Sequence, residues 1–178
     1  MLRLLGWRVE GTVADHGRIV AIVAPHSSYW DFLIAIALVF SWNLRVRFVA
    51  KKEIFAFPLG PILTWLGGIP VDRKASQGFV EQIVREIERS ETVLLGITPE
   101  GTRTYGAKWK TGFHRIATQA GGVVMPVYLD WERRVIGVLP AVSPSDDPQA
   151  DLRQVVSMFL AFRRKDGKTI DLDRAIGE

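Results

Sequence analysis

His26 and Asp31 are the residues of this chain whose types and spacing could carry acid–base chemistry. Four residues separate them, in the segment Pro-His-Ser-Ser-Tyr-Trp-Asp. If a helix begins just after the histidine, a carboxylate in its first turn can fold back toward the ring, fix its tautomer and stabilise the imidazolium. His26 could then take a proton from an attacking hydroxyl group. The spacing alone is weak, because Asp31 could simply cap its own helix.

Two arginines follow in loops that are rich in glycine or proline. Arg73 ends the sequence Gly-Gly-Ile-Pro-Val-Asp-Arg, and Arg103 ends the sequence Thr-Pro-Glu-Gly-Thr-Arg. The forked donors of arginine match the oxygens of a phosphate, and Gly101 lets backbone approach a ligand closely. We expect Glu100 to accept from a substrate hydroxyl or to orient Arg103. The alternative for Arg73 is a surface ion pair with Asp72.

These segments, in this order, resemble the motifs of the glycerolipid acyltransferase superfamily, which includes the 1-acyl-glycerol-3-phosphate acyltransferases. The resemblance runs from about residue 24 to residue 129. Its most specific part is Glu-Gly-Thr-Arg at residues 100–103, where Thr98 stands in place of the usual phenylalanine. Pro25 stands in place of the asparagine that often precedes the histidine of the family. Residues 124–127 match a weak fourth motif.

The resemblance implies an O-acyltransferase in which His26 is the base and Asp31 the orienting carboxylate. It implies that the acceptor phosphate binds Arg73 and the run Glu100, Gly101, Thr102 and Arg103. The donor would be acyl-CoA or an acyl-carrier protein, without a bound metal or other cofactor. The acceptor would be a lysophospholipid, with lysophosphatidate as the first candidate. The alternatives are another polar lipid, such as a lyso-ornithine lipid, and hydrolysis of an acyl thioester or lysophospholipid.

The composition fits a single domain of 178 residues, with the motif-bearing core at about residues 18–140. The chain has no cysteine, which excludes disulfides and thiolate metal sites. Its net charge of +4 is scattered, without a basic run or nucleic-acid motif, so we do not expect a nucleic-acid partner. The basic excess suits an anionic bilayer. We therefore expect a cytoplasmic protein in peripheral contact with the inner face of the cell membrane.

The pattern of apolar residues predicts strands that alternate with helices. Strands are expected at residues 18–24, 45–50, 69–71, 92–97, 123–129 and 134–139, and helices at 30–41, 77–89, 112–119 and about 151–165. This order predicts an α/β fold, a single layered domain whose mostly parallel or mixed central sheet is flanked by helices. The motif loops each follow a predicted strand, so we expect them on one rim of the sheet.

Three segments carry predictions about burial. The helix at 30–41 is apolar nearly all round, which favours a buried helix. Residues 54–71 carry no charge but contain several prolines and glycines, so a buried connection and a membrane-interface segment fit about equally well. Residues 167–178 are polar, and we expect them to be loosely held. His114, among apolar residues on a predicted helix, is expected to be structural.

Overall fold

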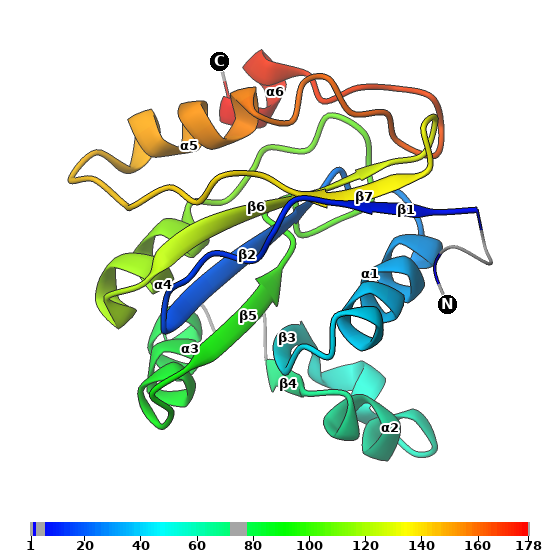
Figure 1. Ribbon diagram of the computed structural model, residues 1–178. Helices are drawn as coiled ribbons and strands as arrows, with labels where there is room; N and C mark the ends of the chain where they lie inside the picture. The colour runs from blue at the N-terminus through cyan, green and yellow to red at the C-terminus, as the bar shows by residue number, and fades with distance from the viewer. Residues whose placement is uncertain (1, 3–5, 72–77, 178) are drawn as a thin grey trace.

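A seven-stranded sheet forms the centre of the protein in the computed structural model, which describes residues 2, 6–71 and 78–177 (Figure 1). The spatial order is β1-β7-β6-β2-β5-β3-β4. Every neighbouring pair is parallel except β6 and β7, so β1 and β7 run opposite to the other five strands. The strands are β1 (Arg8–Glu10), β2 (Arg18–Ala24), β3 (Val46–Lys51), β4 (Gly68–Val71), β5 (Val93–Ile97), β6 (Val123–Asp130) and β7 (Val135–Val138).

The helices lie in two layers, one on each face of this sheet. Helix α1 (Tyr29–Ser41) packs on one face, and α2 (Leu59–Trp65) lies beside it after the 3-10 turn η2 (Lys52–Phe55). The second core, on the other face, includes residues of α3 (Phe79–Glu88), α4 (Gly112–Ala120), α5 (Pro148–Ser157) and α6 (Leu172–Ile176). The predicted α/β class, with a mostly parallel sheet flanked by helices, is confirmed.

The central strand β2 shows why a nearly continuous apolar sequence is needed. Side chains alternate between the faces of a strand, and both faces of this sheet are covered. Ile19 and Ala21 therefore pack in the core under α1, whereas Val20 and Ile22 pack in the core under α3 to α6. All four are buried. The strand ends at Ala24, and the chain then turns at Pro25 toward the site.

Helix α1 is not buried all round, contrary to the prediction. Ile34, Ala37 and Leu38 face the sheet, but Leu33 and Phe40 are 54% and 52% exposed. Apolar composition showed that the helix has a core face. It could not show that, among the described residues, no second layer covers the opposite face.

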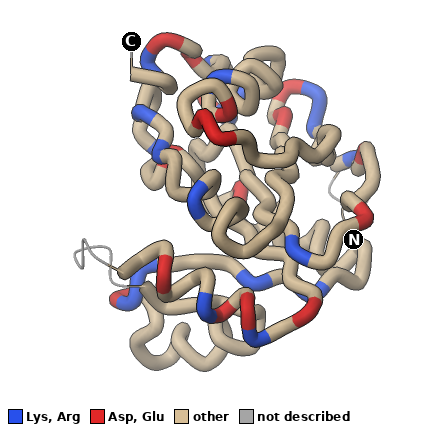
Figure 2. The backbone as a smooth tube through the Cα atoms, turned by 90° about the vertical axis from the view of Figure 1, so that its left-hand side faces the viewer, with Lys and Arg blue, Asp and Glu red and all other residues tan. Residues whose placement is uncertain are grey.

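The uncharged residues 54–71 are largely exposed as far as Trp65, whereas their last part is strand β4, in which Val71 is buried. Helix α2, at the foot of the molecule, carries no charged residue (Figure 2). Within the residues that the structure describes, no helix is long and apolar enough to cross a membrane. The exposed large apolar side chains of this segment are Ile54, Phe57, Leu59, Ile62 and Trp65.

The carboxyl-terminal part differs from the predicted helix at 151–165. Helix α5 begins at Pro148, with Asp147 as its cap, and ends at Ser157. Tight turns follow, in which Phe159 and Phe162 are buried three residues apart. The spacing of these two residues is also that of one face of a helix, so the prediction from the sequence placed the end of the helix too late. Residues 167–177 are held as well, since Ile170, Ala175 and Ile176 are buried in the second core.

Candidate active site

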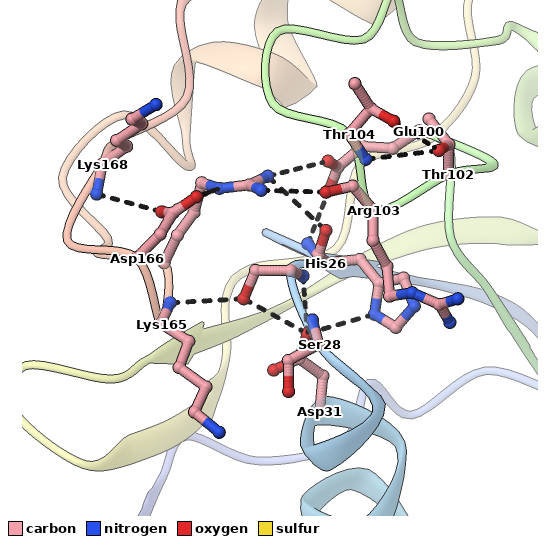
Figure 3. Close-up of polar contacts among 12 residues, drawn as sticks. His26, Ser28, Asp31, Glu100, Thr102, Arg103, Thr104, Lys165, Asp166 and Lys168 are labelled. Carbon is pink, nitrogen blue, oxygen red and sulfur yellow. Dashed lines mark hydrogen bonds and ion pairs between the residues drawn. The ribbon is translucent and has the colours of Figure 1, made fainter.

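Three adjacent strands end at the same rim of the sheet and present the site. β6, β2 and β5 are parallel neighbours, so their carboxyl ends lie together. Trp131 follows β6, His26 follows β2, and Glu100 follows β5. Figure 3 shows the resulting cluster, with side chains from the loop after β2, the start of α1, the loop after β5 and residues 164–168.

Asp31 caps its own helix and also faces His26. Ser28 is the N-cap of α1, and its hydroxyl accepts from the amide of Trp30 at 3.0 Å. Oδ2 of Asp31, in the first turn, accepts the amides of Ser27 and Ser28, each at 2.6 Å. The same oxygen lies 3.3 Å from Nδ1 of His26. The local capping signal therefore also brings the carboxylate to the imidazole.

The second oxygen of Asp31 is held from across the site. Oδ1 accepts from Nε1 of Trp131 at 2.8 Å, and the residue is only 1% exposed. Burial alone would raise the pKa of this carboxyl, but hydrogen bonds from His26, from the Ser28 and Ser27 amides and from Trp131 outweigh burial and lower the pKa below its ordinary value. An ionised Asp31 keeps the hydrogen of His26 on Nδ1, which leaves the lone pair of Nε2 to accept a proton.

Glu100 lies behind the site rather than facing a substrate. Its side chain is buried, and Oε1 accepts the backbone amide of His26 at 2.6 Å. Oε2 lies 3.4 Å from Nη1 of Arg164. Burial raises the pKa of Glu100 to about 7, although the His26 amide and Arg164 oppose this shift. Thus Glu100 joins the loop after β5 to the loop after β2, a position that differs from the expected contact with a substrate hydroxyl.

Arg164 joins four parts of the site through one guanidinium group. Beside Glu100, it reaches the carbonyl oxygen of His26 at 3.5 Å and that of Arg103 at 3.0 Å, and Nε donates to both oxygens of Asp166 at 3.2 Å. Its side chain is 3% exposed. A planar fork with five N–H donors suits such a set of acceptors, and a single ammonium group does not.

The segment that carries Arg164 is fixed against the end of β6. The ring of Phe162 stacks on Tyr128 of β6, with centroids 3.8 Å apart. The amide of Trp131 donates to the carbonyl oxygen of Arg163 at 3.0 Å, and the amide of Lys165 donates to Oγ of Ser27 at 3.2 Å. The residues after α5 therefore close the site from the side of β6.

The Arg103 side chain lies at the exposed edge of the site. Its guanidinium group stacks on the ring of Tyr29, 3.7 Å from the centroid. Thr102 uses its hydroxyl to accept the amide of Thr104 at 3.2 Å, which holds the turn. Gly101 adopts a φ of 63°, a conformation that favours glycine. The side chain of Lys110 passes over Gly101, so the loop after β5 presents two cations at the rim.

Arg73 falls outside the described residues, so its predicted role stays a prediction. Backbone amides at the start of α1 and at Gly67 are unfavourably placed to stabilise an oxyanion. The amides of Ser27 and Ser28, at the helix start, are already bonded to Asp31. Gly67 precedes β4, at the end of this strand opposite to the motif loop. A Cβ at this glycine would come within 2.1 Å of the carbonyl oxygen of Val46, so close backbone packing explains the residue.

An open groove lies at the opposite end of the sheet from His26. It has a volume of about 800 Å³ and runs between α1, α2 and the first residues of β2, β3 and β5. Phe40 and Trp65 face each other across its edge, with ring centroids 6.3 Å apart. The groove thus connects the two helices that carry exposed apolar side chains.

His114 is buried and belongs to a second histidine–carboxylate pair away from the site. Its Nε2 lies 3.1 Å from Oδ2 of Asp151 and 2.9 Å from the carbonyl oxygen of Ser145. The hydroxyl of Ser145 donates to Oδ1 of Asp151 at 2.8 Å. This pair ties α4 to α5, and Ser145 adds the residues before α5, which agrees with a structural role.

Sequence reasoning missed two residues that fasten the site, Trp131 and Arg164. Trp131 carried a usable signal, because it directly follows a buried parallel strand whose end had to lie at the rim. Arg164 carried none, because it stands in the sequence Arg-Arg-Lys, which reads as a solvated surface group. Its partner His26 is 138 positions away in the chain.

Comparison with known proteins adds one match to this geometry. The model of the Acyltransferase family matches residues 7–130. Neither the curated proteins nor the solved structures gave a match. The matched region includes His26, Asp31 and Glu100, and it ends one residue before Trp131. Because the match covers well over half of the residues of this chain, the chain belongs to the acyltransferase family.

Proposed function

We propose that this acyltransferase moves a fatty acyl group from a thioester donor to the free hydroxyl of a lysophospholipid. The observation that carries the proposal is the contact of His26 Nδ1 with the buried, ionised Asp31, which leaves Nε2 as the basic nitrogen at an exposed rim. Acyl-CoA and an acyl-carrier protein are the two candidate donors. Lysophosphatidate is the first acceptor to test, because Arg103 and Lys110 offer cations beside the same loop.

The proposed reaction is a direct transfer. Nε2 of His26 takes the proton of the acceptor hydroxyl as its oxygen forms a bond to the thioester carbon. The tetrahedral intermediate collapses with loss of the C–S bond, and the imidazolium returns the proton to the departing thiolate. Asp31 stays ionised throughout and stabilises the imidazolium. The products are a diacyl lipid and a free thiol.

In this proposal the phosphate of the acceptor lies against the loop after β5. Arg103 can turn two parallel N–H donors to a phosphate, and its stacking on Tyr29 limits the freedom that binding would remove. Gly101 and Thr102 shape the loop, and we keep Arg73 as a second candidate for phosphate. Glu100 acts from behind by holding the amide of His26.

The first experiment is thiol release from palmitoyl-CoA, with and without lysophosphatidate, for the wild type and for His26→Ala. Removal of a positioned base should lower the rate by about 10²–10⁴-fold. His16→Ala is the matched control, because His16 is an exposed histidine whose ring contacts the backbone of Arg18. Thiol release in the absence of lipid would show that the enzyme hydrolyses the thioester instead of transferring the acyl group. A folded His26→Ala protein with full activity would refute the proposed base.

The acceptor is tested separately through Arg103. Arg103→Gln should raise the KM for lysophosphatidate and leave the KM for the donor unchanged, because in this proposal Arg103 contacts the phosphate of the acceptor and not those of the donor. An acceptor without a free phosphate monoester, such as a lyso-ornithine lipid, serves as the comparison. If the lyso-ornithine lipid is the better acceptor and its KM is the same in Arg103→Gln, the enzyme is an acyltransferase of other polar lipids.

A further inference from the structure

The largest feature that the proposed reaction leaves unused is an exposed apolar face on α1, η2 and α2. Its side chains are between 44% and 90% exposed, and those of three aromatic residues, Tyr29, Phe57 and Trp65, are each more than 70% exposed. Large apolar residues gathered on one face usually mark a surface that binds something. The face consists of Tyr29, Trp30, Leu33, Phe40, Ile54, Phe57, Leu59, Ile62 and Trp65.

The face is continuous across the two helices. Phe40 of α1 and Trp65 of α2 are in ring contact, 6.3 Å between centroids, and both are more than half exposed. The intervening groove is lined by residues of both helices. At its other end the face reaches the site, since Tyr29 and Trp30 directly precede Asp31. The apolar face and the mouth of the site therefore share one side of the molecule.

Cations border this face and acidic groups are few. Lys51 and Lys52 stand just before Ile54, separated from it by Glu53, and the ammonium group of Lys165 lies 5.4 Å from the ring centroid of Trp30. Arg103 stacks on Tyr29. Residues 29–71 contain four Lys or Arg and two acidic residues, of which Asp31 is buried. In Figure 2, α2 itself is free of charge.

We propose that the face formed by α1, η2 and α2 docks the protein on an anionic lipid bilayer, with the mouth of the site turned toward the membrane. Tryptophan, tyrosine and phenylalanine favour the interface between headgroups and acyl chains, and a basic border suits anionic headgroups. A protein partner or a second copy would not need that combination. The inference rests on the proposed function, because the expected acceptor and product are bilayer lipids.

Docking can be measured without turnover, by co-sedimentation of the full-length protein with vesicles. The vesicles consist of phosphatidylcholine alone or of phosphatidylcholine with phosphatidylglycerol. The wild type should bind both and bind the anionic vesicles more tightly. Phe57→Gln combined with Trp65→Gln should weaken binding to either vesicle by about tenfold or more, because two exposed rings no longer enter the interface.

Charge is tested by a matched pair of variants. Lys51→Gln with Lys52→Gln should weaken binding to anionic vesicles by about fivefold for each cation removed, and leave binding to phosphatidylcholine unchanged. Arg85→Gln with Arg89→Gln removes one cation from α3 and one from its C-cap, on the other face of the sheet, and should change binding to neither vesicle. Thermal unfolding and activity on a water-soluble donor and acceptor verify that the variants are folded.

The outcomes separate this inference from the proposed function. His26→Ala should bind vesicles like the wild type. If the wild type binds vesicles through this face but transfers no acyl group, the docking stands and the proposed function fails. The docking is overturned if the wild type binds neither vesicle, or if the Phe57 and Trp65 variant binds like the wild type. It is also overturned if that variant only converts a dimer to a monomer without any vesicle binding.

Discussion

Oδ2 of Asp31 lies 3.3 Å from Nδ1 of His26 while it also completes the cap of its own helix. One carboxylate oxygen thus supports both local structure and the base. The two contributions can be separated, because the other half of the capping box belongs to Ser28, whose hydroxyl bonds the amide of Trp30.

Asp31→Asn should lower kcat by about 10²–10⁴-fold, because a neutral amide no longer stabilises the imidazolium or fixes the tautomer of His26. Ser28→Ala removes only a capping bond and should cost about 1 kcal/mol of stability with little change in kcat. Urea denaturation and initial rates measure the two quantities for both variants. Equal losses of kcat in the two variants would mean that Asp31 acts only as a cap.

Arg164 is expected to position the site rather than to touch the substrate. Arg164→Met leaves the buried Glu100 without its cation, which should cost about 3–5 kcal/mol and lower kcat. Arg164→Lys should recover part of kcat, because an ammonium group can serve some but not all of the acceptors.

The control is Arg163→Met. Arg163 is half exposed and pairs with Glu132 at the surface, so its loss should change stability by less than about 1 kcal/mol. Rates are compared at temperatures where every variant is folded. The donor KM should remain constant while kcat changes. A loss of folded protein with a normal kcat in the remainder would assign Arg164 to stability alone.

Glu100 should make stability fall as the pH rises from about 4.5 to about 7. Its pKa in the folded protein is about 7, above the ordinary value of 4.5. Between these values the folded state therefore binds more protons than the unfolded state, and each rise in pH disfavours folding. The full contribution of Glu100 to the free energy of unfolding is about 3 kcal/mol, and nearly all of it is lost by about pH 7.

Urea midpoints of the wild type and Glu100→Gln, measured between about pH 4 and about pH 8, test this expectation. The variant should show a flatter curve in that window. Asp31 acts in the opposite sense, because its pKa is lowered, and its stabilisation is lost only as the pH falls below the ordinary range of a carboxyl. Parallel curves for the wild type and Glu100→Gln would show that folding does not raise the pKa of Glu100.

The pair of His114 and Asp151 should matter for stability and not for rate. Asp151→Asn weakens bonds to Ser145 and His114 that are buried, at a cost of about 1–3 kcal/mol. We expect kcat per folded molecule to stay within about twofold of the wild type, because the pair ties α4 to α5, away from His26. Denaturation and initial rates distinguish this carboxylate from Asp31, and a large fall in kcat would contradict its structural role.

The sequence was sufficient for the fold class because the strands and the motif loops are local signals. Apolar runs bounded by glycine and proline marked the parallel strands, and parallel strands must share a rim. The start of α1 was also predictable, since Ser28 and Asp31 form the two halves of a capping box within four residues.

The remaining features depend on what the rest of the chain places nearby. Arg164 is buried only because Phe162 stacks on Tyr128 and draws the segment against β6. The exposure of Leu33 and Phe40 depends on the absence of a covering layer over α1 in the described residues, and no residue of α1 encodes that. The orientation of Glu100 away from the rim likewise follows from Arg164, across 64 positions of sequence.

The family match ends at residue 130, yet the indole that holds Asp31 and the guanidinium that holds Glu100 come later in the chain. For protein engineering, this means that the matched region cannot be transferred alone. A chimera that joins residues 7–130 to the carboxyl-terminal part of another family member would contain His26 but neither Trp131 nor Arg164. Residues 131–168 must be transferred together with residues 7–130 if the site is to keep its geometry.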